Sequence, residues 1–154
     1  MQNKISNTGF YLCMFFVLEL ILPFQLNASD TDPADSAVQA SLTNTYWKLV
    51  ELEGQAVKTA AGQREIKLTL RGENKVTGFA GCNSFFGSYT FDESKITISQ
   101  LATSRKFCTE TMDMETLFLK ILTEVAGYKI IGQTLYLSDD KGKLQARLQA
   151  VYLK

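Results

Sequence analysis

Apolar residues after position 45 recur with a period of two in short segments, and this alternation limits the chain to a fold built mainly from β-strands. Ile66, Leu68 and Leu70 give the clearest case, because one polar residue stands between each pair. Successive side chains of a strand point to opposite faces of a sheet, so one face of such a segment enters a core and the other meets water. Turn residues such as Gly72 and Asn74 separate this segment from the next one.

Eight segments of this kind predict eight strands. They cover residues 46–52, 66–71, 75–80, 88–91, 95–99, 128–131, 135–137 and 144–153. Several of the connections are short and contain Gly, Asp or Asn, which favours hairpins between consecutive strands. The sequence therefore indicates a mainly β domain.

Residues 114–125 follow a helical period instead. Their apolar positions are three, one, three, one and three residues apart, as on one face of an amphipathic helix. The members of this stripe are Met114, Leu117, Phe118, Ile121, Leu122 and Val125. The charged residues are expected largely off it, and they are Asp113, Glu115, Lys120 and Glu124. One helix among the strands makes the predicted class α+β, and we interpret the stripe as core rather than as a cofactor site.

The ends of this helix carry their own signals. Thr109 or Thr111 can cap its start through the hydroxyl group. Asp113 suits the positive end of the helix dipole. Gly127 is expected in the left-handed conformation that often ends a helix.

The first 28 residues have the layout of a secretory signal peptide. Lys4 precedes a continuously apolar run over residues 10–18, and Ala28 offers a small residue at the cleavage position. A retained membrane anchor is one alternative, but spanning needs roughly 20 apolar residues, and Glu19 and Pro23 interrupt the run. A start site placed too early, before a cytosolic domain, is the other. Residues 29–42 are small, polar and acidic, which predicts a flexible linker before a domain over 43–154.

Composition excludes several classes of function. The chain has no histidine, so it cannot build a Ser-His-Asp or Cys-His nucleophile. Two cysteines in the domain are too few for a zinc site made of cysteine alone. Basic and acidic residues balance over the chain and are scattered, which argues against nucleic-acid binding. We therefore predict no enzyme activity, no metal and no cofactor.

The segment from Gly78 to Tyr89 resembles the central motif of META (HslJ-like) domains, a Gly-Cys-Asn turn followed by an aromatic residue and a Gly-x-Tyr strand. Here the turn is Gly81-Cys82-Asn83. Other family marks stand in the same order: Trp47 in a first strand, residues 101–104 before a second cysteine, and a helix opening with Glu115. The resemblance covers roughly residues 43–150. Lys106-Phe107 replace the Met-Ala that the family carries before that cysteine, so a role tied to the methionine is not carried over.

The resemblance implies a small, partly closed antiparallel β-barrel or roll with the helix at one side. Family members are mostly bacterial envelope proteins linked to heat stress and novobiocin resistance, and trypanosomatid relatives are linked to virulence and secretion. No established enzymatic activity comes with the family. We therefore expect a non-catalytic, monomeric binding or interaction module, exported to the periplasm or cell envelope and touching the membrane only through its signal. Its partner would be an envelope protein or a small apolar ligand. A holdase-like chaperone and a carboxylate-based hydrolase are the alternatives.

Cys82 and Cys108 are predicted to form a disulfide. If Cys13 leaves with the signal, these two are the only cysteines of the mature domain, and an oxidising compartment lets them pair. Both lie at the landmark motifs, which the fold could bring together. Two separate buried thiols are the alternative.

The remaining candidates are weighed between structure and binding. Gly81, Cys82, Asn83 and Trp47 are interpreted as structural, because Gly permits a tight bend and Asn tolerates left-handed geometry and bonds its own backbone. The aromatic cluster could fill the core or offer a binding surface, for which the candidates are Phe85, Phe86 and Tyr89. The acidic pairs at 92–93 and 139–140 are interpreted as solvated turn residues.

Overall fold

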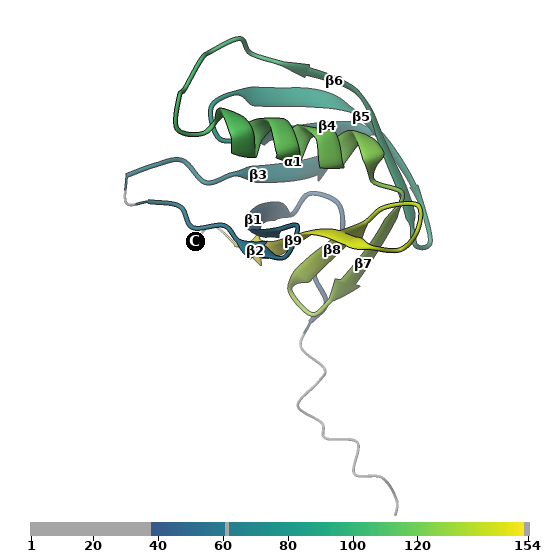
Figure 1. The fold of residues 1–154 in the computed structure, drawn as a ribbon. Coiled ribbons are helices and arrows are strands. Elements are labelled where there is room, and N and C mark those ends of the chain that lie inside the picture. Colours follow the sequence, from purple (N-terminus) through teal and green to yellow (C-terminus); the bar gives the residue numbers. More distant parts are fainter. Residues whose placement is uncertain (1–37, 61, 153–154) are drawn as a thin grey trace, which may run out of the picture. The chain divides into compact units, whose positions relative to one another are not determined.

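The structure is a computed structural model that describes residues 38–60 and 62–152. The predicted signal peptide and residues 29–37 of the predicted linker lie outside the described residues. The described residues form nine strands and one helix (Figure 1). The elements are β1 (Tyr46–Leu52), β2 (Gln55–Ala56), β3 (Lys67–Arg71), β4 (Lys75–Phe79), β5 (Ser84–Asp92), β6 (Lys95–Thr103), α1 (Met112–Glu124), β7 (Gly127–Ile131), β8 (Thr134–Ser138) and β9 (Leu144–Val151).

The strands form one antiparallel sheet that closes on itself. Their order is β2-β1-β3-β4-β5-β6-β7-β8-β9, and β9 also pairs with β1 through the register Trp47 to Ala150. The two-residue β2 pairs only with the end of β1, so the remaining eight strands make the ring. The mainly β class with one helix and the partly closed barrel or roll are confirmed.

Strand pairing within the ring is shortest between β6 and β7. These strands share the single register pair Lys95 and Gly127, whereas β5 and β6 pair along most of their length. Beyond this pair, no strand of the described residues pairs with the edge of β6 that faces away from β5. Helix α1 packs against β6. Figure 1 shows α1 lying across the roll. A helix beside a strand edge protects it from further pairing, so α1 completes the wall where strand pairing stops.

Side chains fill the inside of the roll. Trp47, Leu68, Leu70 and Leu148 are at most 1% exposed, as the period-two pattern predicts. The Trp47 Nε1–H donates a 3.0 Å hydrogen bond to the carbonyl oxygen of Leu42, which satisfies the one polar group of the buried indole. The interior is therefore a packed core rather than a ligand chamber.

The packed domain begins earlier than position 43. Ala40 and Leu42 belong to the core, and the Ala40 N–H donates to the carbonyl oxygen of Gly132. Their predicted place in a flexible linker rested on the small and polar residues around them. The apolar side chain of Leu42 and the pairing of the neighbouring Thr43 with Leu70 place this stretch against the sheet instead.

The β5–β6 hairpin is longer than predicted. It starts at Ser84 instead of 88 and ends at Thr103 instead of 99. A register shift lies between Phe86 and Ser88, opposite Gln100, which has a φ of 56°. This bulge breaks the period of two, and the sequence pattern therefore hid the continuity of both strands.

Helix α1 buries its predicted stripe but ends differently. Phe118, Ile121 and Leu122 are buried, and the Phe118 ring meets Phe85 edge-on with centroids 6.2 Å apart. Thr111 occupies the N-cap position without a hydrogen bond from its hydroxyl to the helix. The chain leaves the helix through Val125 in an extended conformation.

Gly127 is consequently not a left-handed helix cap. It is the first residue of β7 and pairs with Ser138 of β8. A Cβ atom at this position would lie 2.6 Å from Ser138 Oγ, so a larger residue here would have to displace the Ser138 hydroxyl.

Candidate functional site

A buried carboxylate joins the helix to the glycine-cysteine-asparagine turn. Glu115 Oε2 accepts hydrogen bonds from the backbone N–H groups of Cys82 (2.9 Å) and Asn83 (2.6 Å), and its Oε1 accepts one from Asn83 Nδ2 (2.7 Å). The residue is 3% exposed, which corrects the prediction that it lies off the buried stripe. Three donors replace water around the charge, and this compensation permits its burial.

Asn83 extends this cluster to the loop after β6. Its Oδ1 accepts hydrogen bonds from Ser104 Oγ (2.8 Å) and the Lys106 N–H (2.7 Å), and its Nδ2 also donates to the Lys106 carbonyl oxygen. The side chain thus bonds a distant loop, not its own backbone as predicted. Gly81, with a φ of 129°, supplies the bend of the turn. This arrangement serves structure, because every polar atom of the Asn83 side chain is used within the fold.

The predicted disulfide between Cys82 and Cys108 is confirmed. Their Cα atoms are 5.8 Å apart and the bond links residues 26 positions apart. It ties the turn before β5 to the segment before α1, beside the hydrogen bonds of Asn83. The alternative of two separate thiols is wrong.

The three aromatic residues considered for a binding surface lie in different places. Phe85 and Tyr89 are 2% and 3% exposed and belong to the core, and the Tyr89 hydroxyl donates to the Arg71 carbonyl oxygen. They cannot form a surface. Phe86 is 62% exposed on the outer face of β5. Alternation along the strand separates Phe86 from its neighbour, so the predicted cluster is divided between core and surface.

The acidic turn after β8 is organised by one of its two carboxylates. Asp139 Oδ1 accepts the N–H groups of Lys141 (3.0 Å) and Lys143 (2.8 Å), and its Oδ2 accepts Gln145 Nε2 (2.8 Å). The hydrogen bond from the Lys143 backbone is the main reason that the pKa of Asp139 lies below its ordinary value. A carboxylate held ionised in this way shapes the turn and is unsuited to act as a general acid.

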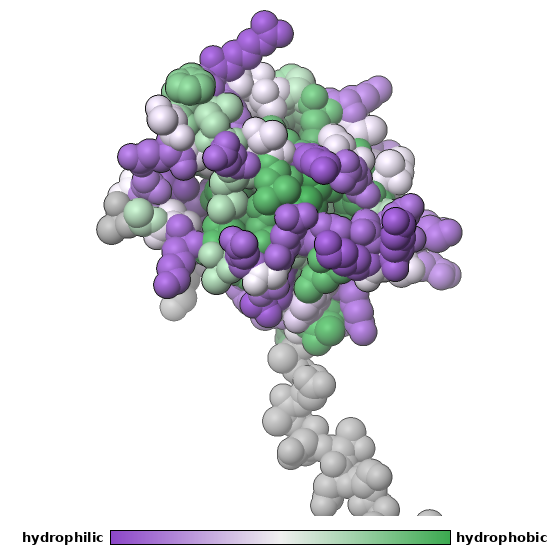
Figure 2. Space-filling view, viewed as in Figure 1, coloured by the Kyte–Doolittle hydropathy of each residue, from purple (hydrophilic) through white to green (hydrophobic). Residues whose placement is uncertain are grey.

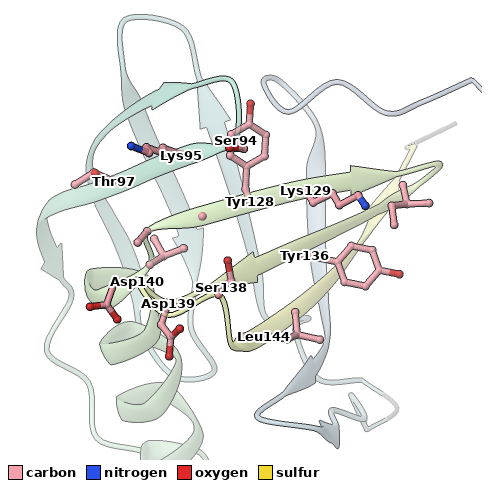
Figure 3. A pocket seen from close by; sticks show the side chains of 15 residues that line it. Ser94, Lys95, Thr97, Tyr128, Lys129, Tyr136, Ser138, Asp139, Asp140 and Leu144 are labelled. Carbon is pink, nitrogen blue, oxygen red and sulfur yellow. The ribbon is translucent and has the colours of Figure 1, made fainter.

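An open groove lies on the outside of the roll where β6, β7 and β8 meet the turn before β9 (Figure 3). Its volume is about 850 Å³. Gly127 and Ser138 both line it. In Figure 3 the side chains of Tyr136 and Leu144 lie to one side of the groove, and Lys95 lies on the other side.

The groove combines apolar groups with charges of both signs, because Asp139 and Asp140 line it as well. Ile131 is 52% exposed and Leu144 is 41% exposed, and both line it together with the ring of Tyr136. Lys95 and Lys129 also line it, and neither forms an ion pair with another residue of the described chain. Sequence reasoning missed this site, because its residues come from four separate segments and no local pattern joins them.

A second, apolar hollow lies between α1 and β2. Leu52, Val57, Met114 and Leu117 line it, and its volume is about 270 Å³. Figure 2 shows apolar surface at the centre of the face that carries α1, surrounded by hydrophilic side chains. The hollow between α1 and β2 is smaller than the groove beside β7.

Among residues 38–60 and 62–152, no three Cys, Asp or Glu side chains lie close enough together to hold a metal ion. No helix of this part of the chain is both long and apolar enough to cross a bilayer. What the exposed groups can do is bind another molecule by apolar contact, hydrogen bonds and charge.

Comparison with known proteins identifies a family and a fold. The family model described as "META domain" matches residues 40–152. A protein from Burkholderia xenovorans, solved by NMR, is 27% identical with a TM-score of 0.57, over 73% of this chain and 85% of that one. A second NMR structure is 16% identical with a TM-score of 0.57, over 71% of this chain and 95% of that one, and shows the fold alone. No curated protein matches the chain.

Proposed function

The chain belongs to the META domain family, and from that membership we propose that it is a non-catalytic, exported binding module that holds an extended segment of another envelope protein in the groove beside β7. The binding would support stress tolerance or secretion in the cell envelope.

One contrast carries the proposal. The buried polar groups of the family motif, Glu115 and Asn83, bond to each other and to the backbone. The open groove, by comparison, presents apolar side chains, amines and carboxylates to the outside. Catalysis needs reactive groups converging in a cleft, whereas recognition of a partner needs exposed anchors with a polar rim. The distribution of groups supports recognition.

The shape of the groove favours a polypeptide over a small apolar molecule. Small-molecule sites enclose most of their ligand, but this groove is open and the inside of the roll is packed. Ile131 and Leu144 offer anchors for apolar side chains, Lys95 and Lys129 offer charge to acidic groups, and the lining carboxylates of Asp139 and Asp140 offer charge to basic ones. A segment that carries apolar residues flanked by charges of both signs is therefore the partner of best fit.

The disulfide supports the proposed compartment. Disulfides form and persist in oxidising environments and are rare in the cytosol. The Cys82–Cys108 pair is compatible with an exported protein.

The proposal is tested by comparing what co-purifies with two variants of the natively exported protein. Ile131→Ser combined with Leu144→Ser removes the apolar anchors of the groove, and Phe86→Ser removes an exposed aromatic residue elsewhere. A protein partner should be lost from the groove variant and kept by the Phe86 variant, with the melting temperature unchanged in both. Loss of a bound small molecule instead would favour the apolar-ligand alternative, and equal recovery of all companions would contradict the proposed site.

The absence of catalysis is tested separately. Purified protein should show no esterase, peptidase or phosphatase turnover in a broad substrate screen. Robust turnover that a single point substitution abolishes would favour the carboxylate-based hydrolase.

A further inference from the structure

We propose that Cys108 is the sulfur through which the Cys82–Cys108 disulfide exchanges with an external thiol or disulfide, and that Arg64 favours an anionic partner at that sulfur. The inference concerns a different place from the groove beside β7. It does not depend on the proposed function.

The two sulfurs of the bond are presented unequally. A groove of about 490 Å³ lies between the segment before β3 and the segment before α1, and Cys108 lines it. Cys108 is half-buried. Cys82 is 5% exposed and does not line the groove. Of the two cysteines, only Cys108 borders open space from which a nucleophile can approach.

Charge reinforces this difference. The backbone N–H of Cys82 already donates to the Glu115 carboxylate, so it is not free to donate to the sulfur of Cys82. The Cys108 groove holds the guanidinium of Arg64, which lies 4.0 Å from the centroid of the Phe79 ring. The ring fixes the cation in place.

Glu110 also lines this groove and carries the opposite charge. Arg64 and Glu110 are both exposed, so water and salt screen both charges, but only Arg64 is held by an aromatic ring. Removal of the Arg64 charge and removal of the Glu110 charge should therefore change the reaction of an anionic reagent at Cys108 in opposite directions.

The exchange proceeds in two displacements. The thiolate of a dithiol partner attacks Cys108 Sγ; a partner–Cys108 bond forms, the bond to Cys82 breaks, and the electron pair leaves on Cys82 Sγ. The second thiolate of the partner then attacks the partner sulfur that is bonded to Cys108, which closes the disulfide of the partner and releases Cys108 as a thiolate. The two protein sulfurs take up the two protons that the partner thiols lost, so the partner is oxidised to a disulfide and the protein gains two electrons. With a disulfide partner the same steps run in reverse and form the bond.

The fold around the bond should survive its reduction. The turn remains attached to the loop after β6 by the hydrogen bonds of Asn83 to Ser104 and Lys106, and to α1 by those of Glu115. Both sulfurs consequently stay in place, and the pair can close again.

The first test labels the reduced wild-type protein with a short pulse of iodoacetate, an anionic alkylating reagent whose thioether product the second thiol cannot displace, and locates the label by mass spectrometry. Cys108 should react at least roughly tenfold faster than Cys82, because a buried thiol reacts only through local opening. In denaturant the two rates should become equal. Fluorescence of the buried Trp47 reports that the reduced protein is folded during the pulse. Equal rates in the folded protein, or faster labelling of Cys82, would overturn the proposal.

The second test separates charge from access. Arg64→Gln should slow labelling of Cys108 by iodoacetate about two- to fivefold at low salt, and Glu110→Gln should accelerate it. Neither change should act in the same direction on (2-bromoethyl)trimethylammonium, a cationic alkylating reagent. Arg71→Gln, at the opposite end of β3 from the groove, is the matched control and should leave the rates unchanged. If Arg64→Gln slows both reagents equally, the assigned role of Arg64 is wrong.

Discussion

Glu115 has three hydrogen-bond donors around one carboxylate, and this geometry makes its identity strict. A glutamine at this position keeps one acceptor oxygen, but its amide N–H₂ then faces either the two backbone N–H groups or Asn83 Nδ2. Two donors in contact leave a buried polar group unsatisfied. The size and shape of the side chain are unchanged, so the substitution isolates the hydrogen bonds.

We therefore expect Glu115→Gln to lower the free energy of unfolding by about 1–3 kcal/mol. Urea denaturation followed by Trp47 fluorescence measures it. Glu124→Gln, at the exposed end of the same helix, is the control and should change the stability little. A Glu115 variant as stable as the wild type would show that the cluster does not hold the turn.

The sequence gives limited information about such residues. Glu115 occurs in the first turn of a helix, which is a common place for an acidic residue. Nothing in its neighbours reveals that the turn at 81–83 lies against it, because this contact spans more than thirty positions of the chain. Cys82 and Cys108 were easier to pair, since they are the two cysteines of the domain.

At the scale of single elements, the β4–β5 hairpin depends on a glycine that accommodates an aromatic ring. Gly78 pairs with Phe85, and a Cβ at Gly78 would overlap both the Phe85 ring and the carbonyl oxygen of Lys67. A smaller aromatic partner would relieve only the first overlap. The second involves backbone and cannot be relieved by a rotamer change.

Gly78→Ala should therefore destabilise the domain by about 1–3 kcal/mol, the usual cost of overpacking. Gly72→Ala is the control, because a Cβ there meets no atom within 4 Å. Differential scanning calorimetry of the two variants gives the comparison. A Gly78 variant that melts with the wild type would contradict the packing described for β4.

The turn between β8 and β9 makes stability depend on pH through Asp139. Its hydrogen bonds hold the pKa of the folded state below the ordinary value, so the folded protein binds this proton less readily than the unfolded chain. The contribution of Asp139 is complete above the ordinary pKa of a carboxyl group and is lost as the pH falls through the lower pKa of the folded state.

Asp139→Asn should thus flatten the fall in melting temperature between about pH 5 and pH 2. The asparagine oxygen can still accept the N–H groups of Lys141 and Lys143, so the turn should persist. The adjacent Asp140→Asn serves as the control. If the melting temperature of the Asp139 variant falls with acid as steeply as that of the wild type, the Asp139 carboxylate does not contribute to stability in the way described.

Period and register explain which elements the sequence could predict. The strands with unbroken alternation, such as β3, were found at almost their observed bounds, and so was α1. The bulge near Gly87 shortened the prediction for β5 and β6. β2 has two exposed residues and no alternation to detect.

For the whole molecule, the family motifs predicted the roll and the helix at its side. Local sequence patterns predicted the separate strands but not that the sheet closes into a ring. Closure depends on pairing between β1 and β9, nearly a hundred residues apart. The groove beside β7 depends on this closure as well, since its wall combines β6 with β7 and β8. Its position could therefore not be read from the order of residues.

Export is a property of the whole chain and remains a prediction. The mature protein should begin near Ser29 and lie outside the cytoplasm, because Lys4, the apolar run and Ala28 form a signal with a cleavage position. N-terminal sequencing of the native protein, with fractionation of the cells, checks this. A chain that still starts at Met1 and is found in the cytosol would be inconsistent with it.

The central claim is that the family motif maintains the fold while the groove beside β7 binds a partner. Photo-crosslinking in the exporting cell tests this most directly, with a benzophenone amino acid placed at Tyr136 in the groove or at Phe86 on the outer face of β5. The account predicts one discrete crosslinked protein from position 136, absent from the Ile131→Ser and Leu144→Ser double variant, and no such product from position 86. A discrete product from position 86 alone, or products at 136 that survive the double variant, would contradict it.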